Sequence, residues 1–194
     1  MRTKTWVIIA ILAVILLWVG CGYNGLQNAD QGVKTSWSNV ETNYQRRMDL
    51  YNSVVKTIEG SANFEKSTLK EVIEARANAT RVQVNVDDSA SLGQFQRAQA
   101  QLQGSFSRLM AVAEAYPDLK TTQSFRDFQT QIEGTENRIN TARRDFNSAV
   151  QDYNLRVRRF PRNIIAGLFG YHEKPYYKSD PGSEKAPDIN FNIK

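Results

Sequence analysis

The second half of this chain carries apolar residues at alternating spacings of three and four. The cleanest run of seam positions is Leu92, Phe95, Gln99, Leu102, Phe106, Leu109, Ala113 and Tyr116. This spacing puts the side chains on one side of an α-helix, as in the a/d seam of a coiled coil. Farther on, five apolar residues stand seven apart, at Ile132, Ile139, Phe146, Tyr153 and Phe160. The sequence therefore predicts long helices that pack side by side.

Two earlier stretches show the same helical spacing. The first contains Trp37, Val40, Tyr44, Met48, Tyr51, Val55 and Ile58. Gly60 interrupts it. The second opens near Asn63, or alternatively at Thr68, which has capping-box spacing to Glu71. It fades over residues 82–86, before a polar break at Asp87 and Asp88.

Proline and threonine mark the boundaries of the last two helices. Pro117 ends the third, because the residue before a proline is pushed out of helical geometry. Thr121 or Thr122 can cap the fourth, which would measure roughly 58 Å from residue 122 to 160. We expect an all-α fold: a membrane helix, then an elongated antiparallel four-helix bundle or coiled coil. The aromatic stripe of Trp37, Tyr44 and Tyr51 is expected in its core.

The N-terminus is a membrane-directed segment. Arg2 and Lys4 precede an uninterrupted apolar run from Trp6 to Val19. A basic start and an apolar run have the form of an export signal, but no small-x-small cleavage site follows. Counted to Gly22, the run reaches the short end of what spans a bilayer as a helix. We expect a permanent single-pass anchor, with the N-terminus in the cytoplasm and the bundle outside, since positive charge favours the cytoplasmic side.

Cys21 leaves an alternative open. Val19, Gly20 and Cys21 fit the last three places of a lipoprotein box, although Trp18 stands where leucine is usual. In that case Cys21 would carry a lipid, and the bundle would be held by acyl chains. Both interpretations attach the protein to a membrane. As the single cysteine of the chain, Cys21 also excludes an internal disulfide.

The sequence carries no recognisable active site. His172 is the single histidine, so a nucleophilic triad or a zinc site lacks its parts. No Gly-rich phosphate loop is present. Glu133 and Glu136 share a helix face, a spacing more typical of surface charge or of partners for arginine than of acid–base catalysis. We therefore expect no enzymatic activity, no cofactor, no metal and no small-molecule substrate.

Two groups of residues are candidates for non-catalytic roles. An inter-helix polar network could join Glu133, Glu136 and Arg138 to arginines of other helices, namely Arg46, Arg47 and Arg76. If the first helix leaves the membrane, the fourth returns toward it. Its end is cationic and then apolar, which suits a lipid interface: Arg156, Arg158, Arg159, Arg162, Ile164, Ile165, Leu168 and Phe169. The other interpretation is that this segment folds back over the end of the bundle.

The segment from Ser107 to Pro161 closely resembles the LemA family of bacterial membrane proteins. Its specific parts are Gly134–Arg138 (GTENR), Tyr116–Leu119 (YPDL) and Tyr153–Asn154. Earlier matches are Trp37–Glu41, Gln45–Arg47, Asp49–Leu50 and Glu74–Arg76. The likeness covers about residues 23–172, and the tail after His172 falls outside it. Many family members carry a proline in the stretch that reads DLYNSVV here, at 49–55.

The resemblance implies an N-terminal membrane helix and a helical domain, with no established activity, cofactor or substrate. Some descriptions of the family put the short N-terminus outside, opposite to the charge argument. We expect an anchor or lipoprotein signal at 1–22, a bundle at 23–165, and a membrane-proximal segment with a disordered tail at 166–194.

The expected protein is a scaffold or interaction module in the bacterial inner membrane. Its partners would be the lipid bilayer and other envelope proteins. The net charge of +5 also allows a nucleic-acid or anionic-polymer binder, but the basic residues are dispersed. We therefore expect no nucleic acid. The oligomeric state is not determined by the sequence.

Overall fold

The computed structural model of the chain describes residues 2–59, 65–117 and 122–178. Within these ranges the chain is helical except for the connections between helices and one extended C-terminal segment. The helices are α1 (Arg2–Glu59), α2 (Lys66–Arg81), α3 (Ser89–Ala113), α5 (Gln123–Arg158) and α6 (Arg162–Leu168). The predicted all-α fold with a long apolar N-terminal helix is confirmed.

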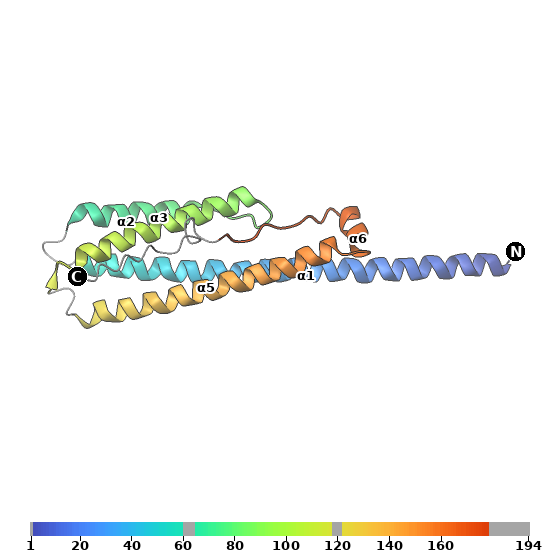
Figure 1. The fold of residues 1–194 in the computed structure, drawn as a ribbon, viewed down its shortest axis with the longest axis horizontal. Coiled ribbons are helices and arrows are strands. Elements are labelled where there is room, and N and C mark those ends of the chain that lie inside the picture. Colours follow the sequence, from blue (N-terminus) through green and yellow to red (C-terminus); the bar gives the residue numbers. More distant parts are fainter. Residues whose placement is uncertain (1, 60–64, 118–121, 179–194) are drawn as a thin grey trace, which may run out of the picture.

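The helices form an elongated antiparallel bundle. In Figure 1, α5 lies along α1, and α2 and α3 form a hairpin beside this pair. The N-terminal part of α1 projects well beyond the other helices. At 1.5 Å per residue its 58 residues measure roughly 87 Å. The fourth long helix, α5, returns toward the projecting end as expected, and α6 lies where α1 enters the bundle.

Two clusters of buried side chains make up most of the core. The distal cluster joins α1, the α2–α3 hairpin and the start of α5, and in it the rings of Tyr51 and Phe106 are stacked with centroids 3.6 Å apart. In the proximal cluster Trp37 meets Phe95 and Phe146 edge to face, at 5.3 and 5.2 Å. These residues occupy the predicted seams, and the expected core stripe of Trp37, Tyr44 and Tyr51 is buried. Each such side chain stabilises the fold by about 1.5–3 kcal/mol through burial.

Side-chain capping fixes where α3 and α5 begin. The Asp88 carboxylate accepts from the backbone N–H groups of Ala90 and Ser91, so the predicted polar break is also the N-cap of α3. The Thr122 hydroxyl accepts from Phe125 N–H and caps α5; the alternative cap, Thr121, lies outside the described residues.

The other predicted boundaries were less accurate. The start at Thr68 is wrong, because α2 begins at Lys66 and Thr68 is buried inside it. The other proposed start, near Asn63, lies outside the described residues. Helix α3 ends at Ala113, before the turn that leads to Pro117.

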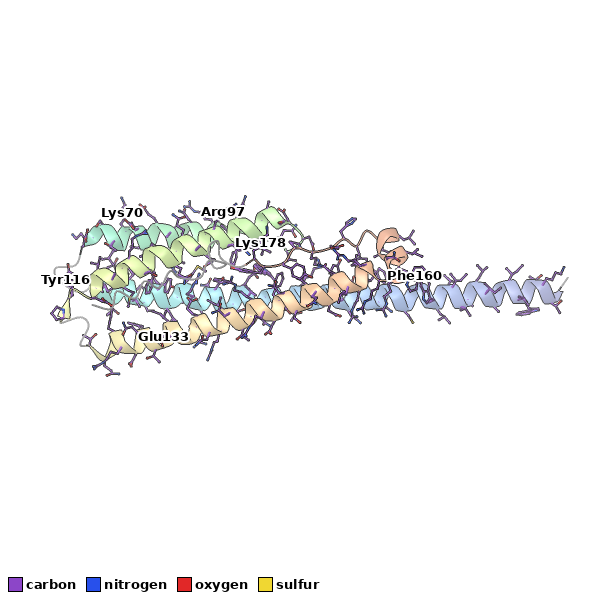
Figure 2. The ribbon with its side chains drawn as sticks, viewed as in Figure 1. Lys70, Arg97, Tyr116, Glu133, Phe160 and Lys178 are labelled. Atoms are coloured by element: carbon purple, nitrogen blue, oxygen red, sulfur yellow. The ribbon has the colours of Figure 1, made fainter. Side chains whose placement is uncertain are left out.

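The heptad of α5 does not reach its predicted last member. Ile139, Phe146 and Tyr153 are buried, but Phe160 is 80% exposed. Figure 2 shows Phe160 where α5 ends. The reason is local: α5 ends at Arg158, and Pro161 then starts α6 as its N-cap residue, so Phe160 no longer follows the helical repeat.

Residues 171–178 are extended and packed on the bundle, unlike the disordered tail that the sequence led us to expect. We call this segment the C-terminal strap. It follows α6 through Gly170, whose φ of 73° allows Tyr171 N–H to reach the Ala166 carbonyl in a Schellman motif. Lys174 and Tyr177 of the strap are each only 5% exposed. The rest of the expected tail, 179–194, lies outside the described residues.

Helix α1 is continuous across both places where the sequence suggested a change. It runs without a break through the boundary between residues 22 and 23, so the membrane-directed segment and the bundle share one helix. It also continues through residues 49–55, the stretch in which this chain lacks a proline.

Candidate functional site

At the end of the bundle from which α1 projects, α6 and its C-cap pack against one stretch of α1; we call this contact, made by Tyr23, Leu26, Ile165, Ala166 and Phe169, the collar. Within it Leu26, Ile165 and Ala166 form a small buried cluster. The ring of Phe169 lies 4.9 Å from that of Tyr23. Helix α6 thus packs on the part of α1 that directly follows the apolar run.

The four apolar residues expected at the interface lie in α6 and at its C-cap, and they divide into exposed and buried ones. Ile164, Leu168 and Phe169 are exposed, as a lipid-facing surface requires. Ile165 is not: it is 2% exposed and occupies the space where a side chain at Gly22 would stand. The expectation of a lipid contact at Ile165 therefore differs from the structure, because this residue fastens α6 to α1.

The four arginines expected at this interface fall into two that are held by partners in the bundle and two that are exposed. Arg156 donates to the Gly25 carbonyl at 3.2 Å and pairs with Asp152. Arg158 pairs with Glu173 of the strap at 2.5 Å, which raises the pKa of the arginine and lowers that of Glu173. Arg159 and Arg162 are exposed. Neither makes an ion pair within the part of the chain that the structure describes.

An inter-helix polar network lies between the two core clusters. Arg47 of α1, 2% exposed, donates to Glu136 of α5 at 3.2 Å and to the side-chain oxygen of Gln99 of α3 at 2.7 Å. Its guanidinium also lies over the ring of Tyr44, 4.6 Å from the centroid. The arrangement joins three helices at one level, so it fixes their register.

The structure brings together only one pair of the six residues considered for this network, Arg47 and Glu136. Arg46, Glu133 and Arg138 are exposed, and Arg76 is half-buried on α2. None of these four forms an ion pair among the described residues. For Arg46, Glu133 and Arg138 the physical reason is their position on the exposed faces of their helices, off the buried seams.

A second buried ion cluster was not foreseen from the sequence. The ammonium of Lys174 in the strap reaches the Asp30 carboxylate at 2.7 Å and also contacts Asp87. It lies 4.9 Å from the centroid of the Tyr153 ring. Burial alone would lower the pKa of Lys174 and raise that of Asp30, but the hydrogen bonds between them outweigh burial, and the two pKa values shift the opposite way.

Two asparagines of α5 hold the backbone of the strap. Asn154 donates to the Lys174 carbonyl at 2.9 Å and accepts from its N–H at 2.8 Å. Asn147, two helical turns earlier, makes the same pair of bonds with Tyr177, at 3.0 and 2.8 Å. The Tyr177 hydroxyl also lies 2.6 Å from that of Tyr44. The sequence signal for this clasp was present as asparagines seven apart, but nothing in the sequence names their partners.

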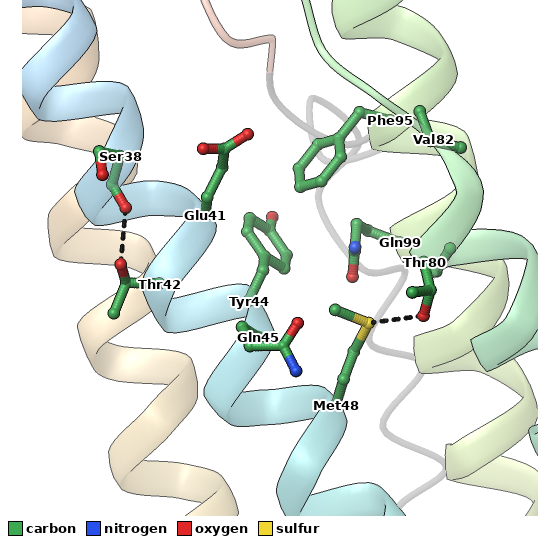
Figure 3. A pocket seen from close by; sticks show the side chains of 11 residues that line it. Ser38, Glu41, Thr42, Tyr44, Gln45, Met48, Thr80, Val82, Phe95 and Gln99 are labelled. Atoms are coloured by element: carbon green, nitrogen blue, oxygen red, sulfur yellow. Dashed lines mark hydrogen bonds between the residues drawn. The ribbon is translucent and has the colours of Figure 1, made fainter.

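Open grooves lie on the bundle surface among the residues that the structure describes. The first, of about 430 Å³, lies between α1 and the hairpin (Figure 3). Tyr44, Met48 and Phe95 line its apolar part, and Glu41 and Gln45 stand among its polar residues. The second, of about 460 Å³, lies between α1 and α5 and is lined mainly by polar side chains: Asn39, Asn43, Asn137, Arg138, Thr141, Ala142 and Asp145.

The buried titratable groups of the bundle favour structure over proton transfer. Burial raises the pKa of Tyr51 and of Tyr153 to about 12, so both phenols stay protonated at neutral pH. Among the described residues, no three His, Cys, Asp or Glu side chains are placed to hold a metal ion. What this arrangement can do is fix helix register, hold the strap and present surfaces.

Comparison with known proteins gives consistent matches over most of the chain. The model of a family described as the LemA family matches residues 36–191. The match extends past His172, so the expectation that the tail falls outside the family pattern is wrong.

Individual relatives share about a fifth to a quarter of their aligned residues with this chain. Magnetosome protein MamQ 2 of Paramagnetospirillum magneticum is 24% identical over 196 residues, covering 91% of this chain and 71% of that protein. Magnetosome protein MamQ of Magnetospirillum gryphiswaldense is 21% identical over 84% of this chain and 66% of its own length. Protein LemA of Metamycoplasma hominis is 23% identical over 74% of this chain and 63% of its own length.

Proposed function

Because this chain belongs to the LemA family, we propose that it is a membrane-anchored helical scaffold of the bacterial envelope. In this proposal residues 1–22 form a permanent anchor in the inner membrane, and the bundle from residue 23 presents binding surfaces to other envelope proteins. It has no enzymatic role. The likeness to relatives named magnetosome protein MamQ and protein LemA supports a membrane-associated helical protein.

The observation that carries the proposal is the exposure of the N-terminal third of α1. Its apolar side chains from Trp6 to Trp18 are 41–72% exposed, on every side of the helix. An apolar helix that no part of the protein covers requires a nonpolar solvent, and a bilayer supplies one. By length and composition this helix is long and apolar enough to cross a membrane.

The collar supports a defined depth for the bundle. Fourteen residues from Trp6 to Val19 measure only about 21 Å, short of a hydrocarbon core of about 30 Å. Phe169 lies beside Tyr23, so the exposed apolar side chains of α6 extend the apolar surface to that level. Eighteen residues from Trp6 to Tyr23 measure about 27 Å, close to the required thickness. Ile164, Leu168 and Phe169 therefore dip into the acyl boundary, and Arg159 and Arg162 face the phosphates.

The rigid body of the bundle favours scaffolding over chemistry. Its buried polar groups fix register, and its two grooves combine apolar and hydrogen-bonding side chains. In the proposed orientation the N-terminus is cytoplasmic and the bundle lies outside, because Arg2 and Lys4 precede the span.

Two measurements on the full chain test the anchor. Intact mass and membrane fractionation are compared for the native chain and for Cys21→Ser. A full-length mass with attachment retained in the variant supports a permanent span. A mass that lacks the first 20 residues and carries acyl chains, with processing lost in Cys21→Ser, would replace it by a lipid anchor at Cys21.

A third measurement tests the collar in proteoliposomes. On a Cys21→Ser background, a spin label at Leu168→Cys is compared with one at Ile73→Cys, an exposed apolar position on α2 far from the collar. We expect the label at 168 to be accessible to oxygen dissolved in lipid and the label at 73 to water-soluble nickel complexes. Equal water accessibility at both positions would refute the interface. Replacing Arg159 and Arg162 by Gln should lower the lipid exposure at 168 in anionic vesicles.

The scaffold role is tested in cells by a photo-crosslinking amino acid at Gln45, in the first groove. Crosslinks to a defined set of envelope proteins, lost when the crosslinker is moved to the exposed hairpin position Lys70, support it. Equal products from both positions would count against a specific binding surface.

A further inference from the structure

The first groove, between α1 and the hairpin, contains a buried hydrogen-bond donor that lacks an acceptor in the described part of the chain. Gln99 of α3 is 2% exposed and lines this groove beside Phe95 (Figure 3). Its side-chain oxygen accepts from the Arg47 guanidinium at 2.7 Å, which fixes the orientation of the amide. The side-chain nitrogen is then left without a partner. Because a buried N–H without an acceptor is unfavourable, a ligand that brings an acceptor into the groove gains from this donor.

Apolar side chains surround this donor. The rings of Tyr44 and Phe95 meet edge to face with centroids 5.0 Å apart, and Met48 and Val82 complete the apolar lining. Figure 3 shows Gln99 among them. A methionine thioether is flexible and polarizable, so Met48 can adjust to the shape of a side chain that enters. The groove can therefore take an apolar side chain next to a hydrogen-bond acceptor.

The rim of the groove is acidic. Glu41 is the one charged side chain among the described residues that line it, and it is exposed next to Tyr44 (Figure 3). It forms no ion pair within the described ranges. A ligand that carries a cation beside its apolar part therefore complements the groove in charge.

The dimensions and the donor favour an extended chain over a helix. The lining residues of α1 run from Ser38 to Met48, about 15 Å of helix, which roughly four or five residues of extended chain would span. The carbonyl groups inside a helix are already bonded within it, whereas those of an extended segment are free to accept from Gln99. The bundle holds its own strap in this way, through the side-chain amides of Asn147 and Asn154.

We propose that the first groove binds an extended segment of a partner protein that carries an apolar side chain next to a lysine or arginine. The apolar side chain packs on Met48 and Phe95, a backbone carbonyl accepts from Gln99, and the cation pairs with Glu41. This assignment rests on the scaffold function proposed above and adds the chemistry of the partner. Glu41 lies eighteen residues after Tyr23, about 27 Å along α1, so the partner presents this segment at that height above the collar.

Peptide selection with a charge reversal tests the assignment. The full chain in nanodiscs of zwitterionic lipid selects from a phage-displayed library of random peptides, after depletion on empty nanodiscs. The selection is repeated with Glu41→Lys and with the matched control Glu133→Lys, an exposed position on α5 outside the groove. We expect the native chain and the control to enrich lysine or arginine beside aliphatic residues, and Glu41→Lys to enrich aspartate or glutamate. The same charge preference in all three, or no enrichment, would overturn the assignment.

The affinity of one enriched peptide, measured by fluorescence polarization, tests the single contacts. Glu41→Gln should weaken binding about two- to fivefold, as expected for an exposed ion pair, and Glu133→Gln should not change it. Gln99→Met removes the donor and should weaken binding about two- to tenfold, with circular dichroism to check that the variant folds. Glu41→Gln, at an exposed position, keeps the test valid if Gln99→Met does not fold. Unchanged affinity in Glu41→Gln would overturn the proposed recognition.

Failure of the groove and failure of the scaffold function give different results. Peptides that bind the native and Glu41→Gln chains equally, together with specific crosslinks at Gln45 in cells, would overturn this recognition and retain the scaffold function. Peptide binding that depends on Glu41, without crosslinks in cells, would support the groove chemistry and refute the scaffold function.

Discussion

The buried ammonium of Lys174 is the single group whose removal should most weaken the attachment of the strap. Replacing it by methionine keeps the length of the side chain and removes the charge. Asp30, 7% exposed, then keeps only Lys34, whose side chain is 52% exposed. Asp87 loses a partner but stays 58% exposed and can be hydrated.

The magnitude follows from these exposures. Removing one partner of a fully buried pair costs about 3–5 kcal/mol. Here Asp87 is solvent-exposed and Asp30 retains Lys34. We therefore expect the substitution to lower the free energy of unfolding by about 2–3 kcal/mol, at or below the lower end of that range. For a chain of this size that corresponds to a fall in Tm of roughly 4–12 °C. The strap should separate first, since its other links are the backbone bonds to Asn147 and Asn154.

The dependence on pH gives an independent check. The folded-state pKa of Asp30 is lowered, so its contribution is complete above the ordinary carboxyl pKa of about 3.9 and is lost as pH falls through the lowered value. The pKa of Lys174 is raised, so its contribution is complete below about 10.4 and is lost only at higher pH. Between these limits the stability difference between native chain and Lys174→Met should be constant, and it should shrink in acid.

The assay is thermal unfolding of the full chain in detergent micelles, followed by circular dichroism at several pH values, with hydrogen exchange of the strap amides. Lys178→Met is the matched control, because its side chain is exposed in the same segment and should leave Tm unchanged. If Lys174→Met behaves like this control, or if its effect is as large at pH 3 as at pH 7, the reasoning about the ion cluster is refuted.

Three further substitutions test other contacts. Asn154→Ala removes both bonds to the Lys174 backbone and should cost about 1–3 kcal/mol, seen as faster exchange of the strap amides; unchanged exchange would mean that the clasp does not hold it. Gly22→Leu would meet the Ile165 side chain and should release α6, measured as proteolysis near Gly170; a chain as resistant as the native one would contradict this packing. Arg47→Met leaves Gln99 and Glu136 without their donor and should cost about 2–4 kcal/mol by thermal unfolding, with part recovered by adding Glu136→Gln; no loss would remove the network from the list of stabilising contacts.

The sequence by itself determined the helices and the membrane segment. Apolar spacing of three and four is a local property, because a helix puts such residues on one face whatever its neighbours are. The stripe from Trp37 to Tyr51 and the seam from Leu92 to Ala113 were therefore placed in the core correctly. The exposed apolar run of α1 could also be predicted from local sequence, because no polar residue interrupts it from Trp6 to Val19.

Only the tertiary structure decided which polar groups meet. Arg47 and Arg46 are neighbours in sequence, yet one is buried between three helices and the other is exposed, because a step of one residue turns a helix by 100°. In the sequence Lys174 looked like part of a polar tail. Its burial is compensated by ion pairs with Asp30 and Asp87, which are 144 and 87 residues away in the chain. An extended strap has no internal repeat of hydrophobicity to reveal it. Its order comes from partners on α1 and α5, which become neighbours only when the bundle has formed.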